Sequence, residues 1–237
     1  MSPFAKKLFF WCLTASFGLL PYTAQARRSD ATGIAGYNPT FYFDLTAGFS
    51  TAKSQLILNN DTSTSATYTI GGNAGLEHEY GFYVKNDTNA TGFELNQSTT
   101  AMAWQDTGVR YRMGFFYLGL VFSLLEMQAN REGADLLDAG GSGMGGNVGF
   151  IIPLGRPSVL YLDVVSVTMA KSRNTLTQEV TFGARQDVDI GACINITRRL
   201  LDFLVGFRQR TLAVTADTSG TETLYTTYIG LRMAAFF

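Results

Sequence analysis

The stretch Leu176–Ile196, which reads LTQEVTFGARQDVDIGACINI, decides the fold class. Most of its even-numbered positions are apolar, whereas its odd-numbered positions carry four charges, Glu179, Arg185, Asp187 and Asp189. Successive side chains of a β-strand point to opposite faces, whereas a helix would spread both sets around its circumference. The stretch therefore predicts one β-strand with an apolar face and a charged face. It is far longer than a usual strand of ~5–6 residues.

The same alternation recurs along most of the chain. It is clearest in Tyr68–Val84 and Tyr225–Phe237, and shorter runs lie at about 41–49, 99–112, 116–130, 143–152, 158–171 and 203–216. Short connections at 113–115, 153–157 and 197–200 alternate with longer polar segments at 59–65, 86–98, 130–141 and 217–222. This arrangement predicts a single all-β domain, an antiparallel up-and-down β-barrel.

The composition excludes several classes of protein. Of the 237 residues, 46% are hydrophobic and only 16% are charged, which is not the composition of a disordered chain. A formal net charge of −1 without a basic stripe argues against nucleic acid as a partner. Two cysteines and one histidine supply too few ligands for a cysteine or histidine metal centre. We therefore expect no metal and no other cofactor.

The first 26 residues resemble an export signal. Lys6 and Lys7 precede an apolar segment at 8–20, and Ala24-Gln25-Ala26 supplies small residues at a cleavage site. The apolar segment is too short for a spanning helix, which needs ~20 residues. The sequence thus predicts a signal peptide at 1–26 that is cleaved after Ala26. The barrel domain then occupies 27–237.

Alternation alone does not say whether the apolar faces point inward, as in a soluble barrel, or outward to lipid. Several runs exceed the ~9–11 residues of a tilted membrane strand. Aromatic residues cluster near strand ends at 41–43, 115–117 and 236–237, where membrane barrels carry aromatic girdles. We therefore expect the apolar faces to meet lipid and the charged faces to line the lumen.

The expected lumen charges share one property, which is a position on the polar face of a run. They are Arg110, Arg112, Asp163, Glu179, Arg185, Asp187, Asp189, Arg208, Arg210 and Arg232. Opposite charges in a narrow lumen can pair and so replace lost hydration, which would make them a structural filling. The alternative is a constriction that selects among solutes. Because small barrels are mostly filled by side chains, the structural reading is favoured.

The last strand carries a recognisable pattern: Tyr225, Ile229, Leu231, Met233 and the terminal Phe237. This pattern resembles the C-terminal signature of bacterial outer-membrane β-barrel proteins. The resemblance implies a Gram-negative outer-membrane location and a membrane-insertion signal that the barrel-assembly machinery reads. It also implies outer-membrane lipid as the surrounding medium.

The number of strands follows from where the two ends of the chain lie. A chain that enters and leaves from the same side needs an even number of strands, whereas nine alternating runs are visible. One more turn is therefore needed, either near 75–81 or near 50–54, where the apolar parity shifts. We expect ten strands; the alternative is eight, with 41–58 outside the barrel wall.

Three functions remain open. The first is a small outer-membrane barrel with a structural, surface or narrow-pore role, without catalysis, whose solutes would be small and polar. The second is a lipid- or peptide-hydrolysing barrel that uses His78, the only histidine, as its base. The third is a soluble exported barrel that carries a small ligand. Gly141–Gly146 matches G-x-G-x-x-G, but an alternating strand rather than a helix follows it, so a nucleotide site is not expected.

Overall fold

The computed structural model describes the strands and a few connecting residues. It covers 40–54, 67–77, 80–95, 98–131, 134–155, 158–174, 180–197, 201–215 and 219–236. For most of β2 and all of β3 the description is of the backbone. The predicted signal peptide at 1–26 and its cleavage after Ala26 lie outside the described residues.

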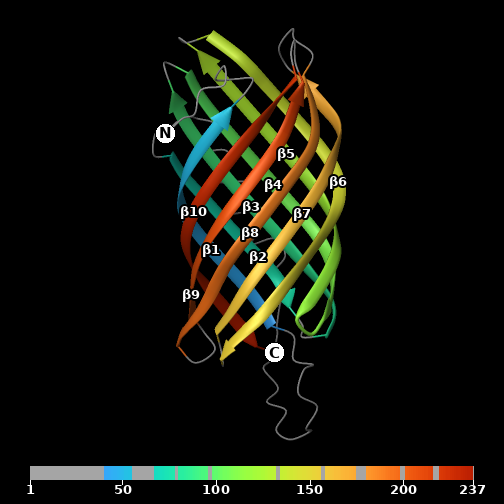
Figure 1. Cartoon of the computed structure of the whole chain (residues 1–237), viewed down its shortest axis with the longest axis vertical. Helices are drawn as coiled ribbons and strands as arrows, with labels where there is room; N and C mark the ends of the chain where they lie inside the picture. Colours follow the sequence, from blue (N-terminus) through green and yellow to red (C-terminus); the bar gives the residue numbers. More distant parts are fainter. Residues whose placement is uncertain are drawn as a thin grey trace, which may run out of the picture.

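The described chain is built of β-strands that tilt around a common axis (Figure 1). The strands are β1 (Thr40–Ser54), β2 (Thr67–Glu77), β3 (Tyr80–Leu95), β4 (Ser98–Met113), β5 (Phe116–Arg131), β6 (Ala134–Gly155), β7 (Ser158–Asn174), β8 (Thr181–Thr197), β9 (Leu201–Thr215) and β10 (Ser219–Phe236). The described residues contain no helix that is long and apolar enough to cross a membrane.

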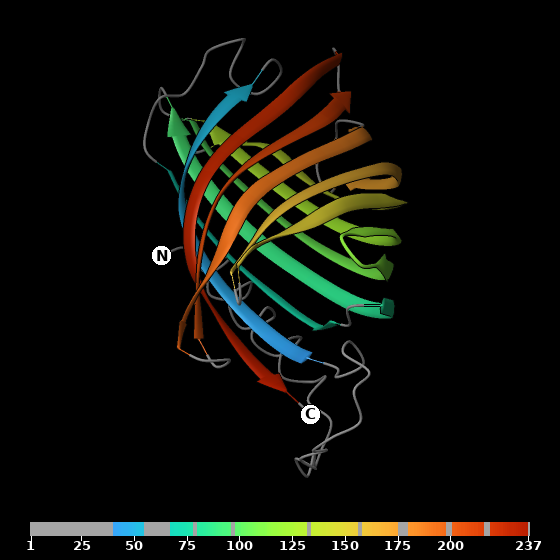
Figure 2. The ribbon, with the colours of Figure 1, turned by 60° about the horizontal axis from the view of Figure 1, so that its bottom comes forward.

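The sheet closes on itself. Each strand pairs antiparallel with its neighbours in sequence, and β1 pairs with β10 to close the barrel, as the oblique view in Figure 2 also shows. Thr40 pairs with Phe236, so the sheet begins and finishes at one end, which we call the terminal end. The other end, where β1 stops at Ser54, is the far end. The predicted fold class and the ten strands are confirmed.

The extra turn lies at one of the two predicted places. Tyr68–Val84 is not a single strand, because β2 stops at Glu77 and β3 begins at Tyr80. The alternation runs across this connection, which is why the sequence pattern alone conceals it. The other place, near 50–54, is wrong, since β1 continues to Ser54 and stays paired with β10. The eight-strand alternative fails because β1 is part of the barrel wall.

Three of the four predicted polar loops belong wholly or mostly to strands, and the fourth, at 59–65, lies outside the described residues. Most of 217–222 belongs to β10, which begins at Ser219. The polar segment 86–98 belongs to β3 and the start of β4, and only 96–97 separates them. Most of 130–141 belongs to β5 and β6. For 130–141 the reason is that the outer face of β5 is polar near this end, with Glu126 and Asn130 exposed, so polar residues there do not signal a connection. Gly141–Gly146 lies within β6, a strand of 22 residues.

The turn predicted at Met113–Phe115 is confirmed. Met113 pairs with Phe116, and two residues connect them. Gly114 has a φ of 65°, the left-handed conformation that two-residue hairpin turns require and that glycine adopts at no steric cost. Arg112 Nε donates to the carbonyl oxygen of Gly114 at 2.8 Å and so closes the turn.

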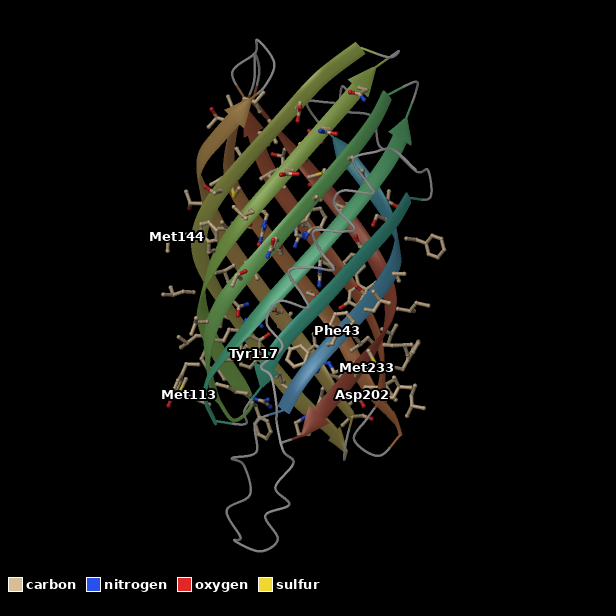
Figure 3. The ribbon with its side chains drawn as sticks, turned by 180° about the vertical axis from the view of Figure 1, so that it is seen from behind. Phe43, Met113, Tyr117, Met144, Asp202 and Met233 are labelled. Atoms are coloured by element: carbon tan, nitrogen blue, oxygen red, sulfur yellow. The ribbon has the colours of Figure 1, made fainter. Side chains whose placement is uncertain are left out.

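The two faces of the wall differ sharply in exposure. Leu124 and Leu125 are neighbours on β5, yet Leu124 is 44% exposed on the outer face and Leu125 is 1% exposed inside. The same contrast separates Met144, which projects outward, from Tyr117, which points into the barrel (Figure 3). In the clearest strands, large apolar side chains are therefore on the outside.

The long alternating run of β8 reverses its phase between Phe182 and Arg185. Phe182 pairs with Val214, whereas Arg185 pairs with Leu212, so β8 carries one extra residue there. Such a β-bulge puts two residues opposite one and shifts the alternation. As a result Phe182 and Arg185 both point inward. The prediction that Val180 and Phe182 share the outer face with Ile190 is therefore wrong.

Three inward tyrosines lie over glycines on the neighbouring strand. Tyr117 is opposite Gly149, Tyr161 is opposite Gly191, and Tyr228 is opposite Gly206. A Cβ at any of these glycines would collide with the ring of its tyrosine. The glycines thus leave room for the large rings against the inner wall.

Adding a methyl group at Gly149 should destabilise the barrel. The new Cβ would meet the Tyr117 ring and the carbonyl oxygen of Leu162, and overpacking of this kind costs about 1–3 kcal/mol. Equilibrium urea unfolding in detergent micelles measures the effect of Gly149→Ala. The matched control is Gly146→Ala on the same strand, where the nearest atom to the new Cβ would be the Gly119 oxygen at 3.8 Å. Equal stability of the two variants would contradict the packing described.

Candidate functional site: paired charges inside the barrel

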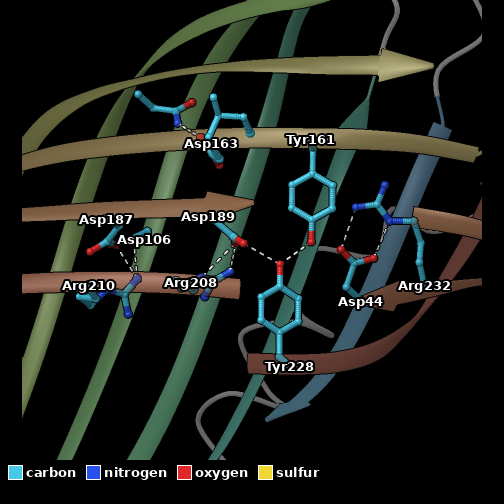
Figure 4. A network of polar contacts seen from close by, with 12 residues as sticks. Asp44, Asp106, Tyr161, Asp163, Asp187, Asp189, Arg208, Arg210, Tyr228 and Arg232 are labelled. Carbon is cyan, nitrogen blue, oxygen red and sulfur yellow. Dashed lines mark hydrogen bonds and ion pairs between the residues drawn. The ribbon is translucent and has the colours of Figure 1, made fainter. Parts of the chain in front are cut away.

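Ten charged side chains in the middle and the terminal-end part of the interior form ion pairs with one another. Five are arginines, Arg110, Arg185, Arg208, Arg210 and Arg232. The other five are aspartates, Asp44, Asp106, Asp163, Asp187 and Asp189. Each forms an ion pair with a member of the opposite set, so this set carries no net charge (Figure 4).

Arg185 on β8 is the most enclosed of these residues, with no exposed side-chain surface. Its Nη2 lies 2.6 Å from Asp106 Oδ2 on β4 and 3.3 Å from Asp187 Oδ2. Its Nη1 donates to Ser123 Oγ on β5 at 2.7 Å. Because β4 and β8 are not neighbours in the sheet, these contacts cross the lumen.

Arg210 on β9 joins the same group. Its Nη2 donates to Asp187 Oδ2 at 2.6 Å and lies 4.0 Å from Asp106. The guanidinium also lies 3.7 Å from the ring centre of Trp104 on β4. A buried cation gains from an aromatic face as well as from a carboxylate, so Arg210 connects opposite sides of the barrel by two kinds of contact.

A second pair crosses from β4 to β7. Arg110 Nη2 donates to Asp163 Oδ2 at 2.9 Å, and Asn147 on the intervening β6 donates to the other carboxylate oxygen. The path is open because Gly119 on β5 has no side chain: a Cβ there would lie 2.8 Å from Arg110 Cγ. The glycine at 119 on β5 thus leaves room for the Arg110 side chain to extend from β4 towards Asp163 on β7.

A third group lies towards the terminal end. Arg208 donates to Asp189 Oδ2 from Nε at 3.0 Å and from Nη2 at 2.6 Å. Tyr228 on β10 donates its hydroxyl to Asp189 Oδ1 at 2.6 Å and also meets the Tyr161 hydroxyl from β7. Asp189 therefore has charged or hydroxyl donors on both carboxylate oxygens (Figure 4).

Arg232 and Asp44 form a two-bond pair between β10 and β1, with distances of 2.8 and 2.9 Å. Arg232 also lies 4.4 Å from the ring centre of Tyr42, and Arg110 lies 5.0 Å from that of Tyr117. The expectation that the aromatic clusters at 41–43 and 115–117 serve only as outer girdles is wrong, because both tyrosines are buried inside.

The predicted lumen residues fall into three groups. Eight of the ten, the five arginines named above with Asp163, Asp187 and Asp189, are brought together by the fold. Arg112 is half-buried at the turn beside Gly114, and Glu179 lies outside the described residues. Sequence reasoning missed Asp44 and Asp106, although each stands on the polar parity of its run. It also missed the tyrosines, whose role depends on the register.

Two other predicted sites are only partly described. Four side chains of the predicted insertion signal, Tyr225, Ile229, Leu231 and Met233, are exposed on the outer face of β10; Phe237 lies outside the described residues. His78 also lies outside them, so the structure adds nothing on a histidine base. The described side chains contain no group of three His, Cys, Asp or Glu that could hold a metal ion.

Little space remains between the charges. A void among the charges offers about 20 Å³ to the centre of a water molecule. That is room for roughly one or two waters. The void is lined by Asp106, Arg110, Asp163, Asp187, Asp189, Arg208 and Arg210. At this level, the described side chains leave no open channel. Their paired charges present neither a ring of one sign nor a cluster suited to binding an ion.

Comparison with known proteins supplies structures but no relatives by sequence. No family model matches the chain, and no curated protein matches it. Among solved structures, Neisserial surface protein A (NspA) matches with a TM-score of 0.38 and 13% identity, covering 81% of this chain and 96% of that one.

Two further solved structures are similar at the same level. The outer membrane protease OmpT from Escherichia coli has a TM-score of 0.41 and 9% identity, covering 87% of this chain and 99% of that one. The outer membrane protein OprG from Pseudomonas aeruginosa has a TM-score of 0.35 and 9% identity, covering 82% and 96%. No activity transfers at such identities, and the fold assignment rests on the strand pairing within this chain.

Replacing Arg185 with an uncharged residue of similar length should lower the free energy of unfolding of the barrel. Arg185→Met leaves Asp106 and Asp187 without one of their cationic partners, and breaking a buried pair costs about 3–5 kcal/mol. Urea unfolding in micelles measures the loss. Arg112→Met removes the same charge from the half-buried turn and should cost at most about 1 kcal/mol. A loss for Arg185→Met no larger than that of Arg112→Met would show that Arg185 is not enclosed.

Proposed function

We propose that this chain is an outer-membrane β-barrel with a structural or surface role, closed at rest rather than open for diffusion. The observation that carries the proposal is the set of ion pairs that cross the lumen, from Arg185 to Asp106 and from Arg110 to Asp163. They occupy the path that an open pore would leave free. The outer-membrane location rests on a second observation, which is the apolar outer wall.

The outer wall supports a lipid environment rather than water. Exposed large apolar side chains stand on β1, β4 and every strand from β5 to β10, with Leu120 70% exposed and Phe49 61% exposed. Soluble monomers rarely expose contiguous apolar patches beyond a few hundred Å². Membrane barrels, in contrast, carry an apolar band around the whole wall. A soluble ligand-carrying barrel would need these side chains inside.

The closed interior argues for a structural or surface role. Two voids beside the paired charges are water-sized, and the balance of sign among these pairs gives no reason to prefer cations or anions. Ion pairs between non-adjacent strands instead hold opposite sides of the wall at a fixed distance. The narrow-pore variant of this function would require several buried pairs to separate at once, each at considerable cost.

The partners follow from the proposed location. Outer-membrane lipid would surround the apolar wall. The barrel-assembly machinery would recognise the last strand, on which Ile229 and Met233 are each 56% exposed on the outer face. Small polar solutes would be partners only of a conducting state.

Fractionation of a Gram-negative host that expresses the full chain tests the location. We expect the protein in the outer-membrane fraction, and we expect unheated samples to migrate differently from boiled ones on a denaturing gel, since a closed barrel resists detergent. Recovery in the soluble periplasmic extract would contradict the proposal and would favour the soluble ligand-carrying barrel.

Planar-bilayer recording tests the closed interior. Protein whose insertion is verified by the same gel shift should give no stable conductance steps in concentrated KCl, because the lumen admits little more than single waters. Heat-unfolded protein from the same preparation serves as the control for bilayer leak. Reproducible steps from the folded protein alone would contradict the closed state and establish a pore.

A further inference from the structure

The outer wall changes character along the barrel axis. On β5 the outward positions from Phe116 to Leu124 are apolar, but the next outward positions towards the far end are polar. Glu126 and Asn130 are exposed there, and Gln128 donates to Asp138 on β6 at 3.3 Å. A carboxylate and an amide pair on the outer face have no suitable environment among acyl chains.

The other strands change in the same sense at the same end. On β1 the exposed Phe49 is followed towards the far end by the exposed Lys53. On β7 the apolar positions give way to Ser166 and Thr168, and on β8 Val188 gives way to Gln186. Ser166 and Gln186 are paired in the sheet, so the polar region continues from strand to strand.

The interior changes in the opposite sense. Past the charged layer, the described inward side chains of the far-end half are mostly apolar and packed against one another. The members of this apolar cluster that come from the strand parts nearest the far end are Ala52, Met102, Leu125, Met127, Ala129, Ala139, Val167, Met169, Val180, Phe182, Leu212, Val214 and Leu224. Arg185 and Arg210 lie next to this cluster along β8 and β9.

Opposite polarity at the two ends indicates two different surroundings. A wall that is apolar outside and charged inside suits lipid, whereas one that is polar outside and apolar inside is that of a barrel in water. The outward apolar run of β5 has nine residues from Phe116 to Leu124, which matches the ~9–11 residues of a tilted spanning strand. β6 has 22 residues, about twice that length.

We propose that the bilayer surrounds only the terminal-end half of the barrel and that the far-end half projects into water as a rigid, soluble-type barrel. This projecting half has its own apolar core. The lipid boundary passes between Leu124 and Glu126 on β5 and between Phe49 and Lys53 on β1. The inference rests on the proposed membrane location and adds the position and extent of the lipid-facing surface.

Fluorescence quenching at four single cysteines tests this boundary. Leu120→Cys and Phe49→Cys lie inside the proposed lipid zone, and Glu126→Cys and Lys53→Cys are their matched partners on the same strands and the same face. Each is made in a background that carries Cys12→Ser and Cys193→Ser, labelled with a fluorophore and reconstituted into phosphatidylcholine vesicles. The quenchers are a nitroxide on the lipid acyl chain and iodide in the water, and the gel shift on heating verifies folding.

The inference predicts that acyl-chain nitroxide quenches the labels at 120 and 49 several-fold more than those at 126 and 53. Iodide should show the reverse order. Equal acyl-chain quenching at all four positions would overturn the inference while leaving the membrane location intact. Absence of acyl-chain quenching at 120 and 49 in folded protein would overturn the membrane location as well.

Discussion

Arg185 has no exposed surface, and a charge in that position is tolerable only where opposite charges and hydrogen-bond acceptors reach it from more than one side. The fold meets this requirement by turning Asp106, Ser123 and Asp187 towards it from three different strands. Those strands lie on opposite sides of the barrel, so one buried guanidinium fixes the distance across the lumen. Arg110 and Asp163 also join strands that are not neighbours, whereas the pairs of Arg208, Arg210 and Arg232 with Asp189, Asp187 and Asp44 join neighbouring strands.

The alternation of side chains was enough to predict an antiparallel barrel, because period two is a local property of each strand. It showed nine runs, and the tenth strand was predicted from the requirement that both ends of the barrel chain lie on one side. It was also enough to place most charges on one face. Alternation did not predict the features that depend on which strands are neighbours and on the register between them. The bulge between Phe182 and Arg185 is visible only against the register of β9. The contact of Tyr228 with Asp189 requires knowing that β9 alone separates β8 from β10 and that both side chains point inward.

The polar loops predicted at 86–98 and 130–141 failed for a different reason. The sequence pattern treated polar residues as signals of a connection, which holds where a strand's outer face is apolar. At the far end the outer face is polar, and the strands continue through it, as with Glu126 and Asn130 on β5. Asn130 and Asp138, which the sequence pattern assigned to a connection, lie on this polar part of the wall. The apolar side chains inside this half, such as Leu125 and Phe182, complete the reversal.

The direction of the charged face is the claim on which the account depends most. A spin-label accessibility scan along β8 in lipid vesicles, one position at a time, measures it directly through relaxation by oxygen, which concentrates in lipid. The account predicts high oxygen accessibility at Val188, Ile190 and Ile194 and low accessibility at Asp187, Asp189 and Phe182. High oxygen accessibility at Asp187 and Asp189, with low values at Ile190 and Ile194, would mean that the charged face meets lipid and the apolar face lines the lumen. That result would contradict the orientation described here.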